Sequence, residues 1–268
     1  MNQTRARAIF LFAAFLIFSS LPALGEDDES VLRLRIGDQA LKDKLIEVEP
    51  GKIVSAKSGS AISFERMVAE MARVRFVYLG ETHDSLAMHR IQARIIRSLS
   101  EKDGPWAVGL EMFPVTRQEV LTKWSLGILE EEEFVREARW YETWNFNFGF
   151  YRDVFSVIKE KGIPLYALNV PRPWISKIRM KGWEALSEEE RRFVPQPDLS
   201  HEEHRKLIRT IFENTEMPHG MKGEGLDMVF KGLYRAQSAW DETMAYHAVN
   251  AARREKARMI VLAGSGHL

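Results

Sequence analysis

Residues 74–83 read VRFVYLGETH, and residues 258–267 read RMIVLAGSGH. In each stretch a short apolar, β-branched run reaches a glycine, and a histidine follows three residues later. An apolar run of this length without polar alternation predicts a strand buried on both faces, as in a parallel sheet covered by helices. The glycine permits a sharp turn and a close approach of the backbone to a ligand. We therefore predict strands over Val74–Leu79 and Arg258–Leu262, each followed by a Gly-x-x-His loop.

Two more strands are predicted between these, over Trp106–Leu110 and Ile163–Leu168. The helices expected around them are Phe64–Ala72 (capped by Ser63), Leu86–Leu99, a long region from Arg117 to about Trp140, Tyr151–Lys161 and Leu233–Glu255, with short helices and loops over 174–232. This alternation predicts an α/β fold, with a mostly parallel central sheet flanked by helices and a helical insertion between the third and fourth strands. The spatial order of the strands stays open.

The first 50 residues are expected to lie outside the α/β domain, which we place at 51–268. Two arginines precede an apolar run at 8–18, and small residues follow it. This pattern is typical of a secretory signal peptide, here 1–25, and the run is short for a membrane-spanning helix. The charge-rich residues 26–50 are interpreted as a linker. We expect export to a bacterial periplasm, in soluble form or held by an uncleaved signal anchor.

The composition excludes several classes of site. The chain has 268 residues, with 38 Lys+Arg against 38 Asp+Glu and no cysteine. The zero net charge argues against nucleic acid as a partner. Without cysteine there are no disulfides, thiolate metal sites, iron–sulfur clusters or covalently attached haem, and no lipoprotein anchor on an N-terminal cysteine. A metal ion or haem iron must therefore be held by His, Asp, Glu, Tyr or Met.

Ionisable side chains follow the predicted strands. Glu81 and His83 follow the first strand, Glu111 the second, Arg172 comes shortly after the third, and His267 follows the fourth. Ligands of open parallel sheets bind beyond the carboxyl ends of the strands. His83, Glu111 and His267 are therefore candidate ligands for Zn, Mn or Fe. Alternatively, the two histidines cap loops by hydrogen bonding to the backbone.

The long helix before the fourth strand carries a mixed stripe. Tyr234, Gln237, Asp241, Met244 and Ala248 share one face at helical spacing. Gln237 and Asp241 need polar partners there and could orient a histidine, although a buried hydrogen-bonded pair without function has the same pattern.

Two further stretches attract attention. Residues 140–151 read WYETWNFNFGFY, which predicts a core or interface patch, or a flat apolar wall for a planar ligand such as haem. Residues 201–204 read HEEH, but a zinc-protease helix needs histidines at i and i+4, so we interpret this stretch as an exposed helical turn. His89 is placed a turn or more into the helix after the first strand, without a role.

Six stretches together resemble one known family. They are VYLGETHDSLAMHRIQ (77–92), GLEMF (109–113), WNFNFGFYRDVF (144–155), IPLYALNVPR (163–172), AQSAWDETMA (236–245) and VLAGSGHL (261–268). In this order they are similar to the ChaN-like family of haem-binding uptake proteins, within the Tiki/TraB/erythromycin-esterase-like superfamily. The superfamily is marked by two Gly-x-x-His motifs and a glutamate, here His83, His267 and Glu111.

The resemblance implies haem or iron binding in uptake or handling, with tyrosine ligation and a homodimer that stacks its haems. An outer-membrane uptake system is an expected partner. Tyr141, Tyr151 and Tyr234 are candidate iron ligands, as is Tyr166. Three further residues, Arg172, Gln237 and Asp241, are expected to contribute to cofactor binding. Similar proteins continue past the second motif, so we expect this chain to be truncated after Leu268.

Two other functions remain open. In the first, the protein is a metal-dependent hydrolase of peptidase or esterase type. His83, Glu111 and His267 hold a divalent metal that lowers the pKa of bound water, and Glu81 is the general base. In the second, the chain is a structural or partner-binding domain whose ancestral site has decayed.

Overall fold

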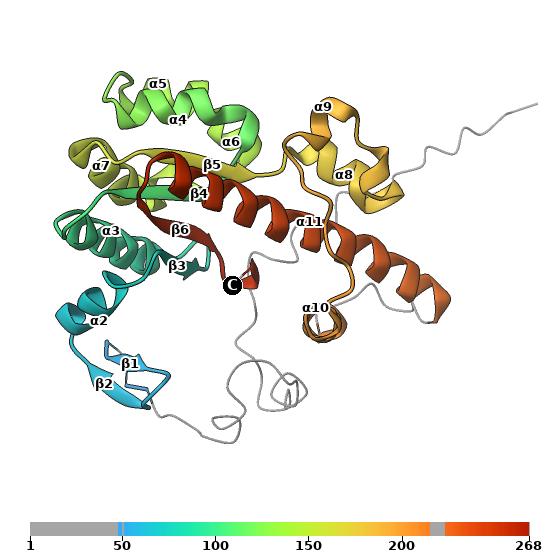
Figure 1. Ribbon diagram of the computed structural model, residues 1–268, viewed down its shortest axis with the longest axis horizontal. Coiled ribbons are helices and arrows are strands. Elements are labelled where there is room, and N and C mark those ends of the chain that lie inside the picture. Colours follow the sequence, from blue (N-terminus) through green and yellow to red (C-terminus); the bar gives the residue numbers. More distant parts are fainter. Residues whose placement is uncertain (1–47, 50, 215–222, 268) are drawn as a thin grey trace, which may run out of the picture.

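The sheet has four parallel strands in the order β3-β6-β4-β5. This computed structural model describes residues 48–49, 51–214 and 223–267, so the predicted signal peptide and nearly all of the linker lie outside the described residues. The strands are β3 (Phe76–Glu81), β4 (Trp106–Pro114), β5 (Leu165–Asn169) and β6 (Arg258–Gly264). The last strand in sequence lies between the first two (Figure 1), which brings the two Gly-x-x-His loops to adjacent strand ends.

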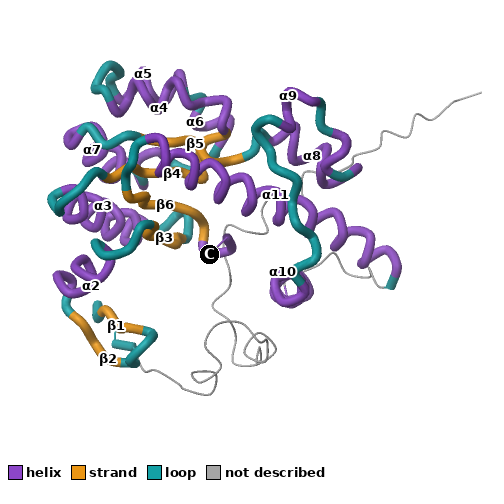
Figure 2. The backbone as a smooth tube through the Cα atoms, viewed as in Figure 1, coloured by secondary structure: helices purple, strands orange, loops and turns teal. Residues whose placement is uncertain are grey.

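Helices cover both faces of this sheet (Figure 2). Ile260 and Leu262 of β6 join one core, and Met259 and Val261 join the other, because successive strand residues point to opposite faces. The first core is closed by α2 (Phe64–Met71), α3 (Leu86–Ser100), α4 (Gln118–Ser125) and α7 (Arg152–Lys161), and the second by α11 (Glu224–Arg254). The predicted α/β class with a parallel sheet is confirmed.

The insertion between β5 and β6 is helical, as predicted. It contains α8 (Arg172–Lys181), the 3₁₀ turn η4 (Trp183–Ala185), α9 (Glu188–Arg191), α10 (Glu202–Asn214) and α11. The helix α11 begins nine residues before its predicted start at Leu233. No helix in the described part of the chain has an apolar stretch long enough to cross a membrane.

The long helical region predicted from Arg117 to about Trp140 is helical, but it is divided into several short helices. The chain there forms the 3₁₀ turn η2 (Val115–Arg117), α4, α5 (Glu131–Glu137) and α6 (Trp140–Thr143), followed by η3 (Phe148–Phe150). Gly127 has a φ of 70°, and Glu130 forms a capping box with Glu133. A left-handed glycine ends a helix and a capping box begins one, so the apolar spacing is shared by separate helices.

The N-terminal part adds a small hairpin. β1 (Ile53–Ser55) pairs with β2 (Ser60–Ile62) antiparallel. The cap at Ser63 is confirmed, because its side chain accepts a hydrogen bond from the N–H of Arg66 at 3.1 Å.

Close packing in the centre of the sheet requires a glycine at position 109. A Cβ there would lie 2.6 Å from Cδ1 of Leu168 and 2.7 Å from Cε of Met259. Both neighbours are fully buried and have little room to move.

We therefore expect Gly109→Ala to lower the free energy of unfolding by about 1–3 kcal/mol through overpacking. Urea denaturation monitored by circular dichroism measures this loss. Leu168→Ala removes one of the two clashing groups, so the double variant should lose less than the sum of the two single variants. Strict additivity would contradict the steric explanation.

Candidate functional site

The carboxyl ends of β3, β4 and β6 enclose a polar cluster, which we call the carboxyl-edge cluster. Its members are Glu81, His83, His89, Gln92, Glu111, Tyr151, Asp241 and His267. Most of these side chains are buried, and they come from two strand ends, two loops and three helices. The strand order explains their meeting, because it places the two Gly-x-x-His loops side by side.

Glu81, the last residue of β3, is the centre of the first half of this cluster. Its carboxylate accepts hydrogen bonds from the hydroxyl of Tyr151 at 2.6 Å and from Nε2 of Gln92 at 2.9 Å, and Nδ1 of His83 lies at 3.0 Å. Burial alone would raise the pKa of Glu81, but its interactions with His83, His89 and Tyr151 lower that pKa to about 2. Glu81 is therefore an ionised acceptor.

His83 is oriented by this carboxylate. An ionised carboxylate only accepts, so Nδ1 of His83 carries the proton and donates to Glu81. No described residue forms a hydrogen bond with Nε2 of His83, and the ring packs against Trp144 and Phe146 with centroid distances of 4.6 and 5.2 Å. A Cβ on Gly264 would lie 2.8 Å from Cε1 of His83, so the second motif needs its glycine to accommodate the histidine of the first.

The second half of the cluster surrounds His267. Nδ1 of His267 lies 2.6 Å from Oδ1 of Asp241, and Nε2 lies 3.4 Å from Oε1 of Glu111. Glu111 also accepts the backbone N–H of Gly264 at 2.6 Å. Burial alone would lower the pKa of His267, but Glu111 and Asp241 raise it to about 10. His267 is thus an imidazolium with both N–H groups directed at carboxylates.

The polar residues of the α11 stripe lie against this imidazolium. Nε2 of Gln237 donates to Asp241 at 3.2 Å and to the carbonyl of Gly266 at 3.2 Å. Asp241 and Gln237 therefore contact the second Gly-x-x-His loop, and their contribution to cofactor binding stays a prediction.

Three polar residues that lie in or beside the carboxyl-edge cluster were assigned no role by the sequence analysis. His89 is fully buried, with Nε2 3.4 Å from Glu81, and Gln92 lies one helical turn further along α3. His204 was interpreted as part of an exposed turn, but its ring lies between Asp241 (3.5 Å) and the hydroxyl of Tyr234 (3.3 Å). The spacing of His89 and Gln92 on a helix capped by Ser85 was the available signal.

The candidate tyrosines occupy different environments. Tyr151 is fully buried and donates to Glu81, and Tyr234 is buried against α10, with its hydroxyl 3.3 Å from the carbonyl of His201. Tyr141 on α6 is 56% exposed. Arg172 begins α8, and burial lowers the pKa of its guanidinium.

The predicted divalent-metal site is not supported. The described residues contain no group of three His, Asp or Glu side chains arranged to hold a metal ion. The ring of His267 instead contacts two carboxylates, with Nδ1 2.6 Å from Asp241 and Nε2 3.4 Å from Glu111.

The ion pairs of His267 predict a specific pH dependence of stability. Its pKa is about 10 in the folded protein and 6.5 in the reference state, so the stabilisation is complete below about pH 6.5 and is lost as the pH rises toward about 10. We expect the free energy of unfolding to fall in this window by up to about 1.4 kcal/mol per pH unit. His267→Gln should abolish the fall, whereas His247→Gln, a change elsewhere on α11, should retain it. Parallel urea titrations that fell equally in the wild type and His267→Gln would contradict this assignment.

Comparisons with known proteins agree with the fold. Residues 67–268 match the family described as haem-binding uptake, Tiki superfamily, ChaN. Among solved structures, ChaN of Campylobacter jejuni with cofacial haem bound is similar, with 21% identity and a TM-score of 0.62 over 79% of this chain and 78% of that chain. A mutant of the erythromycin esterase EreC in its open conformation shows 14% identity and a TM-score of 0.42 over 75% of this chain and 63% of that chain. No curated protein matches in sequence.

The family match covers most of the chain and contains every strand of the parallel sheet together with both Gly-x-x-His loops. The chain therefore belongs to the ChaN family of haem-binding uptake proteins in the Tiki superfamily.

Proposed function

We propose that this protein is an exported haem- or iron-binding protein that acts in haem uptake. The observation that carries the proposal is the family match over residues 67–268. The signal-peptide pattern of residues 1–25 supports export to a periplasm.

The haem site is proposed at a pocket beside α5 and α6, which we call the Tyr141 pocket. It is open, has a volume of about 450 Å³, and is lined by aromatic residues, three arginines and three glutamates. The exposed ring of Tyr141 supplies aromatic surface, while Trp140 and Phe148 in the lining are buried. The cations are Arg136, Arg139 and Arg152, and the acidic residues are Glu131, Glu132 and Glu142. A planar apolar macrocycle with two carboxylates suits this combination.

Tyr141 is the phenol best placed to meet haem iron. The hydroxyl of Tyr151 is held by Glu81, and burial followed by the charge of Glu81 raises its pKa well above the ordinary value, which disfavours the phenolate. Tyr234 is buried as well. The Tyr141 ring is exposed at the pocket and can approach a ligand without rearrangement of the core.

The backbone around Tyr141 is strained in a way that favours a site. Arg139, just before α6, has a φ of 52°. Left-handed conformations of non-glycine residues cost free energy and gather at functional sites.

Arg136 is the most available partner for a haem propionate. Arg139 pairs with Glu142, and Arg152 pairs with Glu131, whereas Arg136 forms no ion pair with any described residue. When bound, haem would supply an iron centre at this surface. The chain's own groups would then contribute a phenol ligand and a cation for the propionate.

An exposed ligand on a shallow pocket leaves one face of the haem open. The Campylobacter jejuni relative is described with cofacial haem, and we extend that arrangement to a homodimer of this chain with haems stacked between its copies. Delivery to or from an outer-membrane uptake system is part of the same proposal.

Haem titration tests this assignment. We expect hemin to produce a saturable Soret shift with the wild type and with Tyr246→Phe, which removes another exposed phenol on α11. Tyr141→Phe should bind hemin at least about tenfold more weakly, a loss of about 1.4 kcal/mol, and change the ligand-field bands.

Different results would contradict the assigned ligand residue and haem binding itself. Wild-type spectra in Tyr141→Phe, together with a loss of binding in His83→Gln, would move the ligand to the carboxyl-edge cluster. Only non-saturable uptake by the wild type would overturn haem binding itself.

Hydrolysis of an ester or amide is a second candidate, supported by the free Nε2 of His83. In the neutral ring, Nδ1 carries the proton donated to Glu81 and Nε2 holds the lone pair, and a neutral histidine oriented by a carboxylate can act as a general base. With all its oxygens engaged and a pKa of about 2, Glu81 suits the orienting role better than the role of base predicted for it.

If the protein is such a hydrolase, His83→Gln should lower kcat on p-nitrophenyl esters by about 10²–10⁴-fold, and EDTA should have no effect. His247→Gln serves as the matched control. An absence of turnover by the wild type, or full activity of His83→Gln, contradicts this candidate.

A further inference from the structure

A second pocket lies at the opposite edge of the sheet, at the amino ends of β3, β4 and β6. This amino-edge pocket is open and has a volume of about 560 Å³. Its cationic residues are Arg73, Arg75, Arg253, Lys256 and Arg258, and its lining contains no acidic residue. They come from the segment before β3, the end of α11 and the start of β6, so the fold gathers them from distant parts of the sequence.

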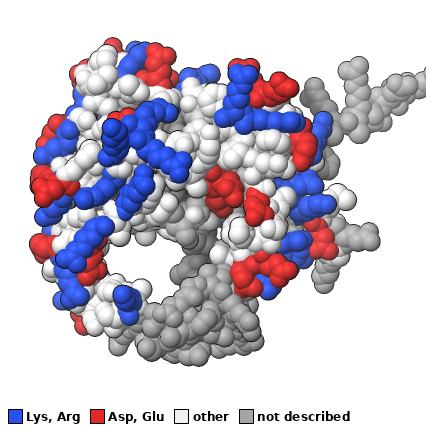
Figure 3. Space-filling model, viewed as in Figure 1, with Lys and Arg blue, Asp and Glu red and all other residues white. Residues whose placement is uncertain are grey.

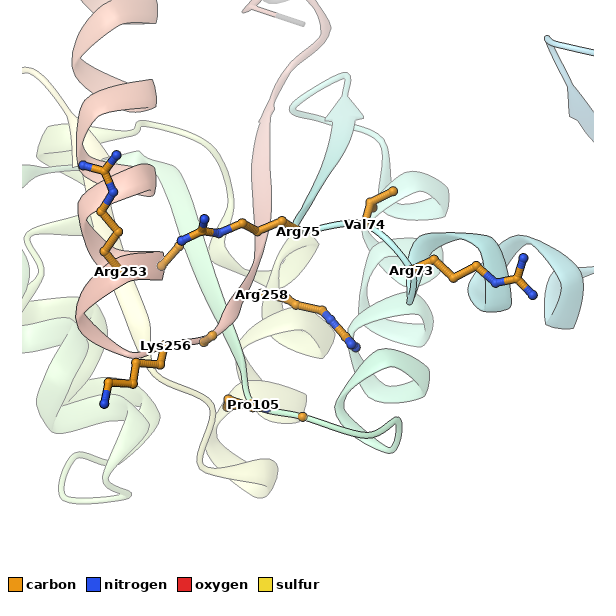
Figure 4. Close-up of a pocket in the computed structure, with 10 residues that line it drawn as sticks. Arg73, Val74, Arg75, Pro105, Arg253, Lys256 and Arg258 are labelled. Carbon is orange, nitrogen blue, oxygen red and sulfur yellow. The ribbon is translucent and has the colours of Figure 1, made fainter.

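The side chains divide into an inner and an outer set. Figure 4 shows Arg75 reaching across the strand ends toward the end of α11, where Arg253 lies, and Arg258 pointing toward the segment of Pro105. Arg73 and Lys256 point outward at the rim. Figure 3 shows the same concentration of Lys and Arg on this face of a chain whose net charge is zero.

None of these five cations forms an ion pair with a described carboxylate. Surface cations elsewhere do, as in Arg97 with Glu160 and Lys177 with Glu190. Clustered cations without counter-charges repel each other, and an anion bound among them removes that repulsion.

Arg258 is held in place by its surroundings. Its Nη1 donates to the carbonyl of Asp103 at 2.9 Å, and its guanidinium lies over the ring of Trp106 at 5.3 Å. A guanidinium fixed in this way loses little conformational entropy when it binds a ligand.

Lys256 occupies a backbone position that favours glycine. The N–H of Ala257 bonds to the carbonyl of Ala252, and that of Lys256 to the carbonyl of Arg253, which is the Schellman arrangement at the end of α11. Lys256 has a φ of 50° in its left-handed position. The chain thus keeps a cation where glycine would relieve strain, and such strain gathers at functional sites.

The dipole of α11 explains the presence of only some of the cations in this pocket. Cations near a helix C-terminus are favoured, which explains Arg253 and Lys256. Arg75 and Arg258 are not residues of α11 and lie just before β3 and at the start of β6. The end of α11 therefore does not by itself explain why these two arginines line the same pocket.

We propose that the amino-edge pocket binds a phosphate-bearing anion, either a free phosphorylated compound or the headgroup of an anionic lipid. Several guanidinium groups match the oxygens of phosphate, and the volume suits one small ligand. Val74, 46% exposed at the rim, adds apolar surface for the carbon part of either ligand. This site is separate from the Tyr141 pocket and does not depend on haem binding.

Calorimetry with inorganic pyrophosphate on the full chain tests the proposal. We expect binding by the wild type that weakens as salt rises. Arg75→Gln/Arg253→Gln should bind at least about tenfold more weakly. The control Lys181→Gln/Lys231→Gln removes the same charge from exposed positions outside the pocket and should bind like the wild type.

Lys256→Gly separates a binding role from a structural one. It should weaken pyrophosphate binding while leaving the thermal unfolding midpoint equal or higher, because glycine relieves the left-handed strain. A lower midpoint with unchanged binding would contradict the role of Lys256 in the site.

Binding to lipid vesicles distinguishes a lipid headgroup from a free phosphorylated compound. Co-sedimentation with phosphatidylglycerol–phosphatidylcholine vesicles, but not with phosphatidylcholine alone, identifies a lipid headgroup if Arg75→Gln/Arg253→Gln abolishes it. Pyrophosphate binding without vesicle binding identifies a free ligand.

The proposal is overturned if neither probe binds, or if the control variant loses as much affinity as Arg75→Gln/Arg253→Gln. Hemin titration of that pocket variant should match the wild type, which keeps this test independent of the proposed function.

Discussion

The buried carboxylate of Glu81 is the constraint on which the arrangement of the carboxyl edge depends. An ionised group inside a protein is tolerated only when its oxygens are paired, so its partners must be held firmly. Gln92 comes from α3, Tyr151 from the turn before α7, and His83 from the loop after β3. These hydrogen bonds tie three elements to the end of one strand and leave Nε2 of His83 without a hydrogen-bond partner among the described residues.

Among the described residues, charged side chains are paired at the carboxyl edge of the sheet and unpaired at its amino edge. At the carboxyl edge, Glu111, His267 and Asp241 alternate in sign, and each charge is compensated by the next. At the amino edge, five cations line one pocket without a carboxylate. The zero net charge of the chain conceals this asymmetry, because net charge reports the sum and recognition depends on the local distribution.

The sequence predicted those features that depend on local pattern. Apolar runs located the four parallel strands, and the Gly-x-x-His spacing located two loops that meet. Strand order depends on long-range packing and could not be derived. His204 was missed because its partner Asp241 lies on another helix. The helical region from Arg117 to about Trp140 was predicted without its internal boundaries, because periodicity alone does not indicate the break at Gly127.

Trp140 connects the buried cluster to the proposed haem surface. Its ring packs on Tyr151 with a centroid distance of 5.2 Å, and its Nε1 donates to the carbonyl of Phe146 at 2.6 Å. The same residue lines the Tyr141 pocket. The Glu81–Tyr151 hydrogen bond thus holds the ring against which the buried indole of Trp140 packs. Because Trp140 also belongs to the pocket lining, a change at Glu81 should alter the Tyr141 pocket without touching it, and the buried network would then contribute to the proposed haem site even where it performs no catalysis.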